Sequence, residues 1–377
     1  MISKKKAPNH VDNNNQEYST DEYYIKRCLE LAVKGYGYVS PNPLVGCVIV
    51  KKGNVLSEGY HKEFGSNHAE VNAINSALSK KKDVKGSTMY VNLEPCSHFG
   101  KTPPCTDKII ESKIREVVIG TIDPNPRVKG KGAAKLKKAG IKVRTGFLEQ
   151  ECKEVNKFYF KHIKTGLPYI TIKLAQTIDG KIADMEGNSK WISSPESRKF
   201  VHELRSKYDA VLIGKNTLEK DDPELTVRHV QGRNPYRAVI DKNLTPDLNK
   251  KLFSDGYTDR TIIISSEVAD AFLEKIFLER KIKLLTAKLK DDNIDLKDAL
   301  KKMGKLGINS ILVEGGAYTC TEFLKQKLVD ELLIFMSPKL MGKGLSSFIP
   351  ENQMELSRKP VIESINMGND VLIKIKL

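Results

Sequence analysis

The chain has 377 residues and a formal net charge of +16, with 40% hydrophobic and 29% charged residues. This length suggests two domains, and the composition is that of a folded protein rather than a disordered or fibrous one. The longest apolar run, from Leu44 to Val50, is far shorter than the roughly 20 residues of a membrane-spanning helix. We therefore expect no membrane association.

Residues 1–21 carry lysines but no apolar core, so they match neither a secretory signal nor an Arg-rich transit peptide. We expect a disordered tail there and a cytoplasmic protein. The six cysteines are scattered along the chain, which favours reduced thiols over a disulfide framework. The closely spaced Cys96 and Cys105 then become candidates for metal binding.

The positive charge would suit a nucleic-acid partner, because Lys and Arg neutralise phosphates. The excess is spread in small groups, such as residues 80–82, 137–138 and 301–302, without interleaved aromatic residues for base stacking. A solvated basic surface that favours small phosphorylated substrates is the preferred interpretation. We expect no nucleic-acid partner.

Taken in chain order, the first part of the sequence alternates helices and strands. Apolar spacing predicts a helix over 23–35, and the run 45–56 around Lys52-Gly53-Asn54 is typical of a hairpin. The elements predicted next are a helix with Ala73, Ile74, Ala77 and Leu78 on one face, a strand at 88–93, a helix at 106–112, a strand at 117–120, a helix at 133–139 and a strand at 141–143. This alternation indicates a layered α/β sheet.

The segment 152–166 is interpreted as a connecting helix and turn. We predict a tail at 1–21, a first domain at 22–150, a linker at 151–167 and a second domain at 168–377. The second domain is expected to be another α/β unit. Its predicted elements are strands at 169–174, 210–213, 237–240, 261–264, 311–313, 332–336 and 371–375, with helices at 195–205, 268–278, 296–306 and after 318.

Three candidate metal ligands lie at the ends of predicted elements of the first domain. His68 opens a helix, Cys96 follows a strand, and Cys105 precedes another helix. One imidazole and two thiolates suit Zn²⁺ with an open position for water, which is the catalytic pattern. The metal would lower the pKa of that water, and Glu70 would act as general acid and base.

The spacing departs from the H-x-E and P-C-x-x-C signature of zinc deaminases, because eight residues from Ser97 to Pro104 separate the two cysteines. An alternative is a purely structural zinc with His98 as the fourth ligand. Glu70 would then have no role.

The insert between the cysteines, together with other short motifs, resembles the family of bifunctional riboflavin-biosynthesis enzymes. The resemblance covers roughly residues 22 to 376. The segments that carry it are 94–105 (EPCSHFGKTPPC), 40–46 (SPNPLVG), 59–61 (GYH), 123–126 (DPNP), 179–181 (DGK), 191–195 (WISSP), 221–228 (DDPELTVR), 313–316 (VEGG) and 337–340 (SPKL).

The resemblance implies a cytidine-deaminase-like three-layer α/β/α domain followed by a dihydrofolate-reductase-like α/β domain. The first would hydrolyse the 2-amino group of a phosphoribosylated diaminopyrimidinone, and the second would use NADPH to reduce the ribosyl side chain to ribityl. It also implies a homo-oligomer formed through the reductase domains. The implied deaminase substrate residues are Asn42, His61, Lys101, Thr102 and Asn125.

In the second domain the resemblance assigns one group of residues to substrate and another to the cofactor. The substrate group is Ser189, Arg205, Leu225, Arg228 and Glu314, and the cofactor group is Ala175, Trp191, Thr217, Asp221 and the stretch from Gly316. Two arginines suit a ribose phosphate. No G-x-G-x-x-G fingerprint follows a strand, whereas Gly315-Gly316 between a strand and a helix would let a pyrophosphate approach the backbone.

Three alternatives remain open at this point. A polynucleotide deaminase would share the zinc ligands, but the long insert and the second domain argue against it. A non-catalytic zinc module is disfavoured by the presence of Glu70. An active deaminase with an inactive second half is the third alternative, because the reductase residues match less distinctively.

Overall fold

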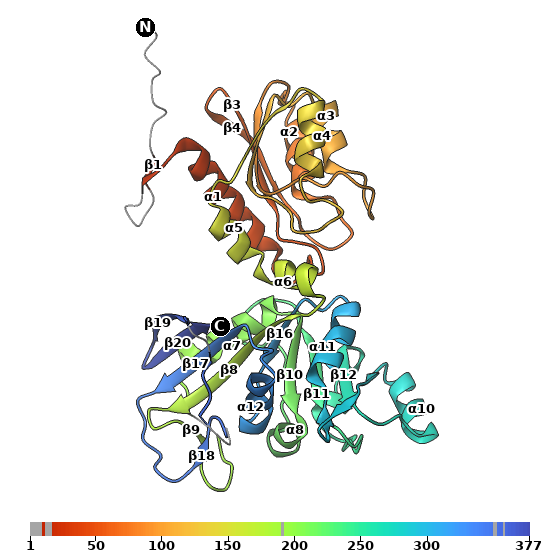
Figure 1. The fold of residues 1–377 in the computed structure, drawn as a ribbon, viewed down its shortest axis with the longest axis vertical. Coiled ribbons are helices and arrows are strands. Elements are labelled where there is room, and N and C mark those ends of the chain that lie inside the picture. Colours follow the sequence, from red (N-terminus) through yellow and green to blue (C-terminus); the bar gives the residue numbers. More distant parts are fainter. Residues whose placement is uncertain (1–9, 12–16, 190–191, 350–352, 357–358) are drawn as a thin grey trace. The chain divides into compact units, whose positions relative to one another are not determined.

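The computed structural model describes residues 10–11, 17–189, 192–349, 353–356 and 359–377. The chain divides into two compact units, Met1–Thr165 and Gly166–Leu377 (Figure 1). In these described ranges, none of the helices has both the length and the apolar character needed to cross a membrane.

The first unit is built on a five-stranded sheet with the order β4-β3-β5-β6-β7. β3 is antiparallel to both of its neighbours, and β5, β6 and β7 run parallel. The strands are β3 (Gly46–Lys51), β4 (Asn54–Tyr60), β5 (Thr88–Leu93), β6 (Glu116–Thr121) and β7 (Lys142–Thr145).

Helices cover both faces of this sheet. Successive residues of a strand point to opposite faces, so each central strand contributes apolar side chains to both helical layers. Val48, Tyr90 and Val118 pack with α1 and α5, whereas Ile49, Met89, Val91 and Ile119 pack with α2, α3, α4 and α6. The helices are α1 (Thr20–Ala32), α2 (Ala69–Ser79), α3 (Cys105–Glu111), α4 (Lys131–Lys138), α5 (Glu149–Val155) and α6 (Lys157–Thr165). The expected three-layer α/β/α arrangement is confirmed.

Several details of this unit differ from expectation. α1 begins at Thr20, because Ser19 and Glu22 form a capping box. Residues 20–21 therefore belong to the helix rather than to a tail, and most of the expected tail, 1–9 and 12–16, lies outside the described residues. Leu78 is 53% exposed, because α2 buries Ala69, Ala73, Ile74 and Ala77 instead. The connecting segment forms two helices, α5 and α6, which meet at Asn156.

The second unit is built on a nine-stranded sheet with the order β13-β12-β11-β10-β16-β8-β17-β20-β19. The strands from β13 to β17 are parallel, and β20 and β19 are antiparallel additions. They are β8 (Tyr169–Thr177), β10 (Ala210–Gly214), β11 (Tyr236–Ile240), β12 (Thr261–Ser265), β13 (Lys283–Thr286), β16 (Ser310–Val313), β17 (Glu331–Ser337), β19 (Val361–Met367) and β20 (Asp370–Lys376).

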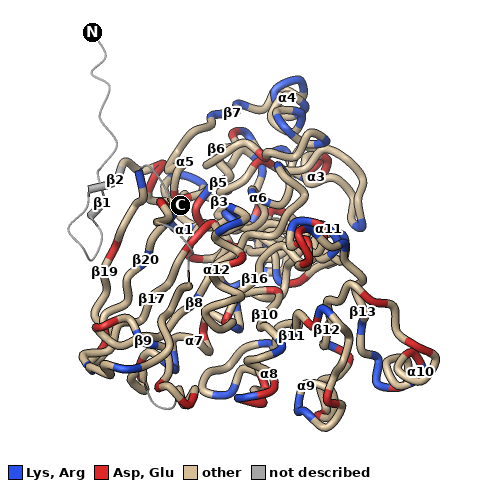
Figure 2. Tube along the Cα trace, turned by 60° about the horizontal axis from the view of Figure 1, so that its bottom comes forward, with Lys and Arg blue, Asp and Glu red and all other residues tan. Residues whose placement is uncertain are grey.

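Helices and short loops complete the second unit. The helices are α7 (Pro195–Lys207), α8 (Lys215–Asp221), α9 (Lys251–Ser254), α10 (Ala271–Glu279), α11 (Leu296–Lys305) and α12 (Ala317–Lys325). Its core is formed by apolar residues of the parallel strands with α11 and α12. The sequence did not predict α8, α9, β13 or β19. Figure 2 shows Lys and Arg interspersed with Asp and Glu along α9, α10 and α11.

Parallel strands place their carboxyl ends, and the loops that follow them, along one edge of the sheet. In this unit β10 leads into Gly214 and α8, and β16 leads into Glu314 and α12. The fold thereby gathers the residues of these loops at a common edge.

Candidate functional site

His68, Cys96 and Cys105 converge in the first unit. Their ligand atoms all lie within 4.8 Å of one another, with His68 Nδ1 at 3.6 Å from Cys96 Sγ and at 3.3 Å from Cys105 Sγ. A tetrahedral zinc ion bound at ~2.0–2.3 Å requires such donors to be roughly 3.5–3.8 Å apart. The residues therefore fit a zinc ion, and His98 is not part of this cluster among the described residues.

The chain brings these ligands together from three element ends. His68 is the N-cap residue of α2, Cys96 follows β5, and Cys105 is the first residue of α3. The backbone N–H of Cys105 donates to Cys96 Sγ at 3.3 Å. The hydrogen bond from the Cys105 thiol is the main cause that lowers the pKa of Cys96 to about 4, so one thiolate forms readily in this site.

Glu70 lies in the first turn of α2, two residues after His68. Glu70 is 3% exposed, and its Oε2 is buried without a hydrogen-bond partner among the described residues. Burial raises the pKa of Glu70 to about 6. A buried carboxyl with a free oxygen beside a metal site can accept and return a proton near neutral pH.

His61 and Asn42 form a pair beside the metal ligands. Burial lowers the pKa of His61, and its Nδ1 lies 3.1 Å from the carbonyl oxygen of Asn67. Since a carbonyl only accepts, Nδ1 carries the proton, and Nε2 accepts from Asn42 Nδ2 at 3.1 Å. The His61 and His68 rings meet edge to face, with centroids 5.0 Å apart.

Two buried asparagines that sequence reasoning missed hold the strand that follows Asn42. Asn92 accepts from the N–H of Gly46 and donates to the carbonyl of Leu44. Asn156 accepts from the N–H of Leu44 and donates to the same carbonyl. These four hydrogen bonds fix the backbone of Leu44 and Gly46, close to the predicted substrate residue Asn42.

The other predicted deaminase residues lie on nearby loops. Lys101 places its Nζ 4.0 Å from the centroid of the Phe64 ring, and the carbonyl of Thr102 accepts from the N–H of Gly100. Asn125 uses its side-chain oxygen to accept from the N–H of Arg127, which closes a turn. No hydrogen bond or ion pair among the described residues joins these three side chains to the His61 and Asn42 pair.

Glu94 anchors the loop that carries Cys96, and sequence reasoning did not single it out as a site residue. Its carboxylate is 4% exposed and accepts hydrogen bonds from the backbone N–H groups of Asp123, Gly130 and Ala133 at 2.9 to 3.3 Å. The loop before α4 and the first turn of that helix are thereby tied to the end of β5.

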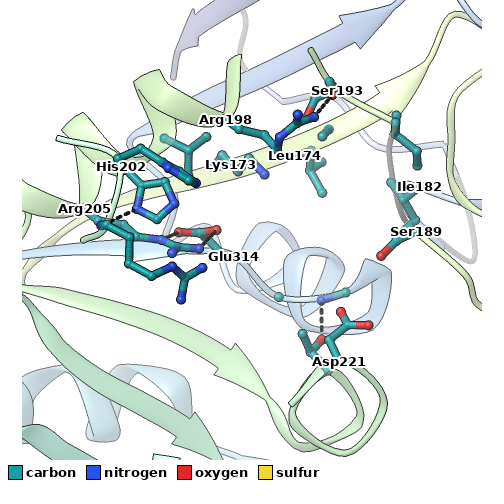
Figure 3. Close-up of a pocket in the computed structure, with 18 residues that line it drawn as sticks. Lys173, Leu174, Ile182, Ser189, Ser193, Arg198, His202, Arg205, Asp221 and Glu314 are labelled. Atoms are coloured by element: carbon teal, nitrogen blue, oxygen red, sulfur yellow. Dashed lines mark hydrogen bonds and ion pairs between the residues drawn. The ribbon is translucent and has the colours of Figure 1, made fainter. Parts of the chain in front are cut away.

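A cavity of about 440 Å³ opens in the second unit at the carboxyl ends of its strands (Figure 3). Of the predicted residues, eight line it: Ala175, Ser189, Arg205, Thr217, Asp221, Arg228, Glu314 and Gly316. Leu225 does not line it but is 2% exposed, with a left-handed φ of 54°. Trp191 lies outside the described residues.

Arg205 and Glu314 form the polar floor of this cavity. Arg205 donates to both carboxylate oxygens, at 2.7 and 3.0 Å, and to the carbonyl of Thr226 at 3.1 Å. Burial alone would raise the pKa of Glu314, but the charge of Arg205 outweighs it and the pKa is lowered. Arg228 pairs with Glu224 and is more exposed than Arg205.

A second cavity of about 610 Å³ adjoins the first, and the two share Ile182, Ser189, Thr217, Asp221 and Gly316. Gly316 is the N-cap residue of α12, and its N–H donates to Thr217 Oγ1 at 3.2 Å. An elongated molecule in the second cavity would reach the first where these shared residues lie.

Lys173 and His202 are among the cavity residues that sequence reasoning missed. Lys173 of β8 lines the first cavity, and burial lowers its pKa. His202 of α7 also lines it. The available signal was helical spacing: Arg198, Val201, His202 and Arg205 recur at intervals of three and four residues, which places them on one face of a helix.

Comparison with known families matches both units. The family described as "Cytidine and deoxycytidylate deaminase zinc-binding region" matches residues 18–121. The family described as "RibD C-terminal domain" matches residues 168–373.

Individual relatives match over nearly the whole chain. The Riboflavin biosynthesis protein RibD of Aquifex aeolicus is 45% identical over 94% of this chain and 98% of its own length. That of Escherichia coli is 40% identical over 85% and 89%. A crystal structure of a diaminohydroxyphosphoribosylaminopyrimidine deaminase/5-amino-6-(5-phosphoribosylamino)uracil reductase from Thermotoga maritima is 39% identical, covers 94% and 98%, and superposes with a TM-score of 0.83.

Proposed function

Because the chain belongs to the RibD family of bifunctional riboflavin-biosynthesis proteins, we propose that the residues gathered in its two sites carry out the two reactions of that family. The first unit is a zinc-dependent deaminase that hydrolyses diaminohydroxyphosphoribosylaminopyrimidine. The second is an NADPH-dependent reductase that acts on 5-amino-6-(5-phosphoribosylamino)uracil. The family match over 168–373 favours this function over a polynucleotide deaminase.

In the deaminase, His68, Cys96 and Cys105 would hold the zinc ion, which supplies a Lewis acid that makes water nucleophilic at neutral pH. Glu70 carries two protons in turn: the first from that water to the ring nitrogen, and the second from the hydroxyl group added to the ring to the amine, which leaves as ammonia. The observation that carries this role is the Oε2 of Glu70, which is buried beside the ligand cluster and has no hydrogen-bond partner in the part of the chain that the structure describes.

Substrate orientation in the deaminase is assigned to Asn42, His61, Lys101, Thr102 and Asn125. The neutral His61 ring accepts from the Asn42 amide, so the Asn42 side-chain oxygen remains available to an amino group of the pyrimidine. Lys101 carries the positive charge that suits the ribose phosphate, and its four-carbon stem lets it leave Phe64 to reach that group.

In the reductase, the larger cavity would hold most of NADPH, and the smaller one the substrate together with the end of NADPH that contacts Ala175. The cofactor residues are Ala175, Trp191, Thr217, Asp221 and Gly316, and the substrate residues are Ser189, Arg205, Leu225, Arg228 and Glu314. Reduction adds a hydride to C1 of the ribose and a proton to its ring oxygen. Lys173 lines the substrate cavity with a lowered pKa, which suits it to donate that proton.

We also propose that the protein is a cytoplasmic homo-oligomer that associates through its reductase units. Within the described ranges, β19 pairs with β20 and with no other strand, and it exposes Val361, Ile362 and Ile365. An exposed apolar edge strand favours pairing with a second copy. The variant Ile362→Lys should then dissociate the oligomer, as measured by light scattering.

A coupled assay tests the two reactions together. The purified protein is given the phosphoribosylated diaminopyrimidinone and NADPH, and ammonia release and NADPH oxidation are followed with and without a zinc chelator. Chelation should abolish ammonia release, and NADPH oxidation should follow it in the untreated protein. Ammonia release without NADPH oxidation would contradict the reductase assignment, and chelator-insensitive release would contradict the zinc mechanism.

A further inference from the structure

His202 belongs to the face of α7 that lines the substrate cavity of the reductase. Arg198, Val201, His202 and Arg205 all border this cavity. The His202 side chain is 5% exposed, so the ring is held firmly in place. In Figure 3, His202, Arg205 and Glu314 gather at one end of the cavity, whereas Ser189 and Asp221 lie at the other.

The hydrogen bonding of His202 fixes its tautomer. The backbone N–H of Arg228 donates to His202 Nδ1 at 3.2 Å. Burial, followed by the nearby charge of Arg205, lowers the pKa of His202 to about 4, so the ring is neutral at pH 7. A neutral imidazole has one N–H group, and since Nδ1 accepts, Nε2 carries the proton.

The Nε2–H group has no hydrogen-bond partner in the part of the chain that the structure describes, and the residue borders the cavity. The neighbouring His229 ring contacts it edge to face, with centroids 4.5 Å apart. The two arginines nearby are engaged by carboxylates, Arg205 by Glu314 and Arg228 by Glu224. An uncharged donor beside two arginines suits an anionic oxygen.

The position of this donor matches one end of the substrate. Hydride transfer requires C1 of the ribose to lie beside the cofactor, and the two cavities meet at Ser189, Thr217, Asp221 and Gly316. The phosphate is at C5, the other end of the ribose. It therefore extends away from this junction, toward the end of the cavity where His202 and Arg205 lie.

From this geometry we infer that His202 is a specificity-determining residue of the reductase: Nδ1 fixes the Arg228 backbone, and Nε2–H donates to the phosphate of the substrate. This inference rests on the proposed reductase function, and it assigns a role to a residue outside the set implied by resemblance. His202 is a substrate contact through Nε2 and a positioning residue through Nδ1.

Two amide variants separate the roles of the two nitrogens. In His202→Asn the amide can occupy the place of Nδ1 and keep the Arg228 bond, and in His202→Gln it can reach the place of Nε2 and keep the donor. His202→Gln, which loses the neutral bond to Arg228, should raise the KM for the deaminated substrate about 5-fold. His202→Asn, which loses the bond to the charged phosphate, should raise it at least about 10-fold. His202→Leu loses both bonds and should raise it at least about 50-fold, with kcat and the KM for NADPH little changed.

A dephosphorylated substrate identifies the group that His202 contacts. The loss of kcat/KM in His202→Gln and His202→Asn should be measured with the phosphorylated substrate and with the corresponding riboside. We expect the penalty of His202→Asn, which lacks the Nε2 donor, to disappear with the riboside. An equal penalty with both substrates would overturn the phosphate contact, and a wild-type KM in His202→Leu would overturn the inference as a whole.

Lys199→Gln is the matched control, because Lys199 lies on the same helix, is exposed and does not border the cavity. The ammonia-release rate and the thermal unfolding midpoint of each variant show that the protein is folded. If wild-type protein fails to oxidise NADPH, the proposed function fails. If wild-type protein is active and the His202 variants match it, only the role of His202 fails.

Discussion

Arg205 and Glu314 form a two-point ion pair at 2.7 and 3.0 Å on the floor of the reductase cavity. Their side chains are 11% and 9% exposed. A carboxylate and a guanidinium withdrawn from water to this extent depend on each other, because either charge alone would lie uncompensated in a poorly solvated site.

Glu314→Gln should therefore destabilise the second unit by about 3–5 kcal/mol, the range for breaking one partner of a buried pair. NADPH oxidation should be lost and ammonia release retained. Urea unfolding followed by a probe in the second unit measures the effect. Glu279→Gln removes one partner of the exposed Lys275–Glu279 pair and is the control, which should leave stability unchanged within error. Equal effects of the two variants would contradict the interdependence argued here.

Glu70→Gln should retain zinc and lose deamination by several powers of ten, because an amide cannot transfer the proton that the carboxyl carries. Zinc content by atomic absorption and ammonia release measure the two parts of this expectation. NADPH oxidation with the pre-formed deaminated substrate should stay at the wild-type rate. Ammonia release near the wild-type rate would show that Glu70 is not the proton carrier.

The zinc ligands and Glu70 could be predicted from the sequence. A histidine, two cysteines and a glutamate near the ends of predicted helices and strands are residue types typical of a catalytic zinc site. Lys173 had no such signal, and the helical spacing of His202 gave its face of α7 but not its role, because a lone lysine in a strand and a lone histidine in a helix acquire meaning only when β8 and α7 border the same cavity. Leu225 illustrates the same limit. The loop imposes a left-handed backbone on it, and a leucine at this position does not predict that conformation as a glycine would.

The elements that were missed have similar causes. α8 spans seven residues and buries only Leu218 among them, so its sequence shows no apolar period. β19 is an exposed edge strand whose apolar residues do not face a core. Leu78 was assigned to the buried face of α2 from its spacing, but the buried stripe there is narrow because it consists mainly of alanines packed closely on the sheet.

Gly132 provides a steric test of the zinc site. A Cβ atom at this position in the first turn of α4 would lie 2.0 Å from the carbonyl oxygen of Pro95, the residue before Cys96. Gly132→Ala should displace that loop, destabilise the first unit by about 1–3 kcal/mol and weaken zinc retention during dialysis. Gly100→Ala is the control, because a Cβ there meets nothing within 4 Å. Normal zinc retention in Gly132→Ala would show that the loop tolerates the shift.

Arg144 controls the acid stability of the first unit. It pairs with Glu116 of β6 at 2.7 Å and with Asp21 of α1, to which its second N–H donates at 2.9 Å. Burial alone would raise the pKa of both carboxyls, but the hydrogen bonds and charge of Arg144 outweigh it, and both values are lowered. In the unfolded chain these groups have ordinary pKa values, ~3.9 for Asp and ~4.3 for Glu. The folded protein therefore keeps both carboxylates ionised at a pH where the unfolded chain binds protons.

The resulting stabilisation is fully present above about pH 5 and is lost as the pH falls through the lowered folded-state values. Arg144→Gln should therefore reduce the free energy of unfolding at pH 7 by about 1–2 kcal/mol, discounted for the partial exposure of these side chains. The difference from wild type should shrink toward zero as the pH falls below about 4. Urea unfolding between pH 3 and pH 7 measures this. A difference that stays constant over that range would mean that Arg144 acts through packing and not through its two carboxylate partners.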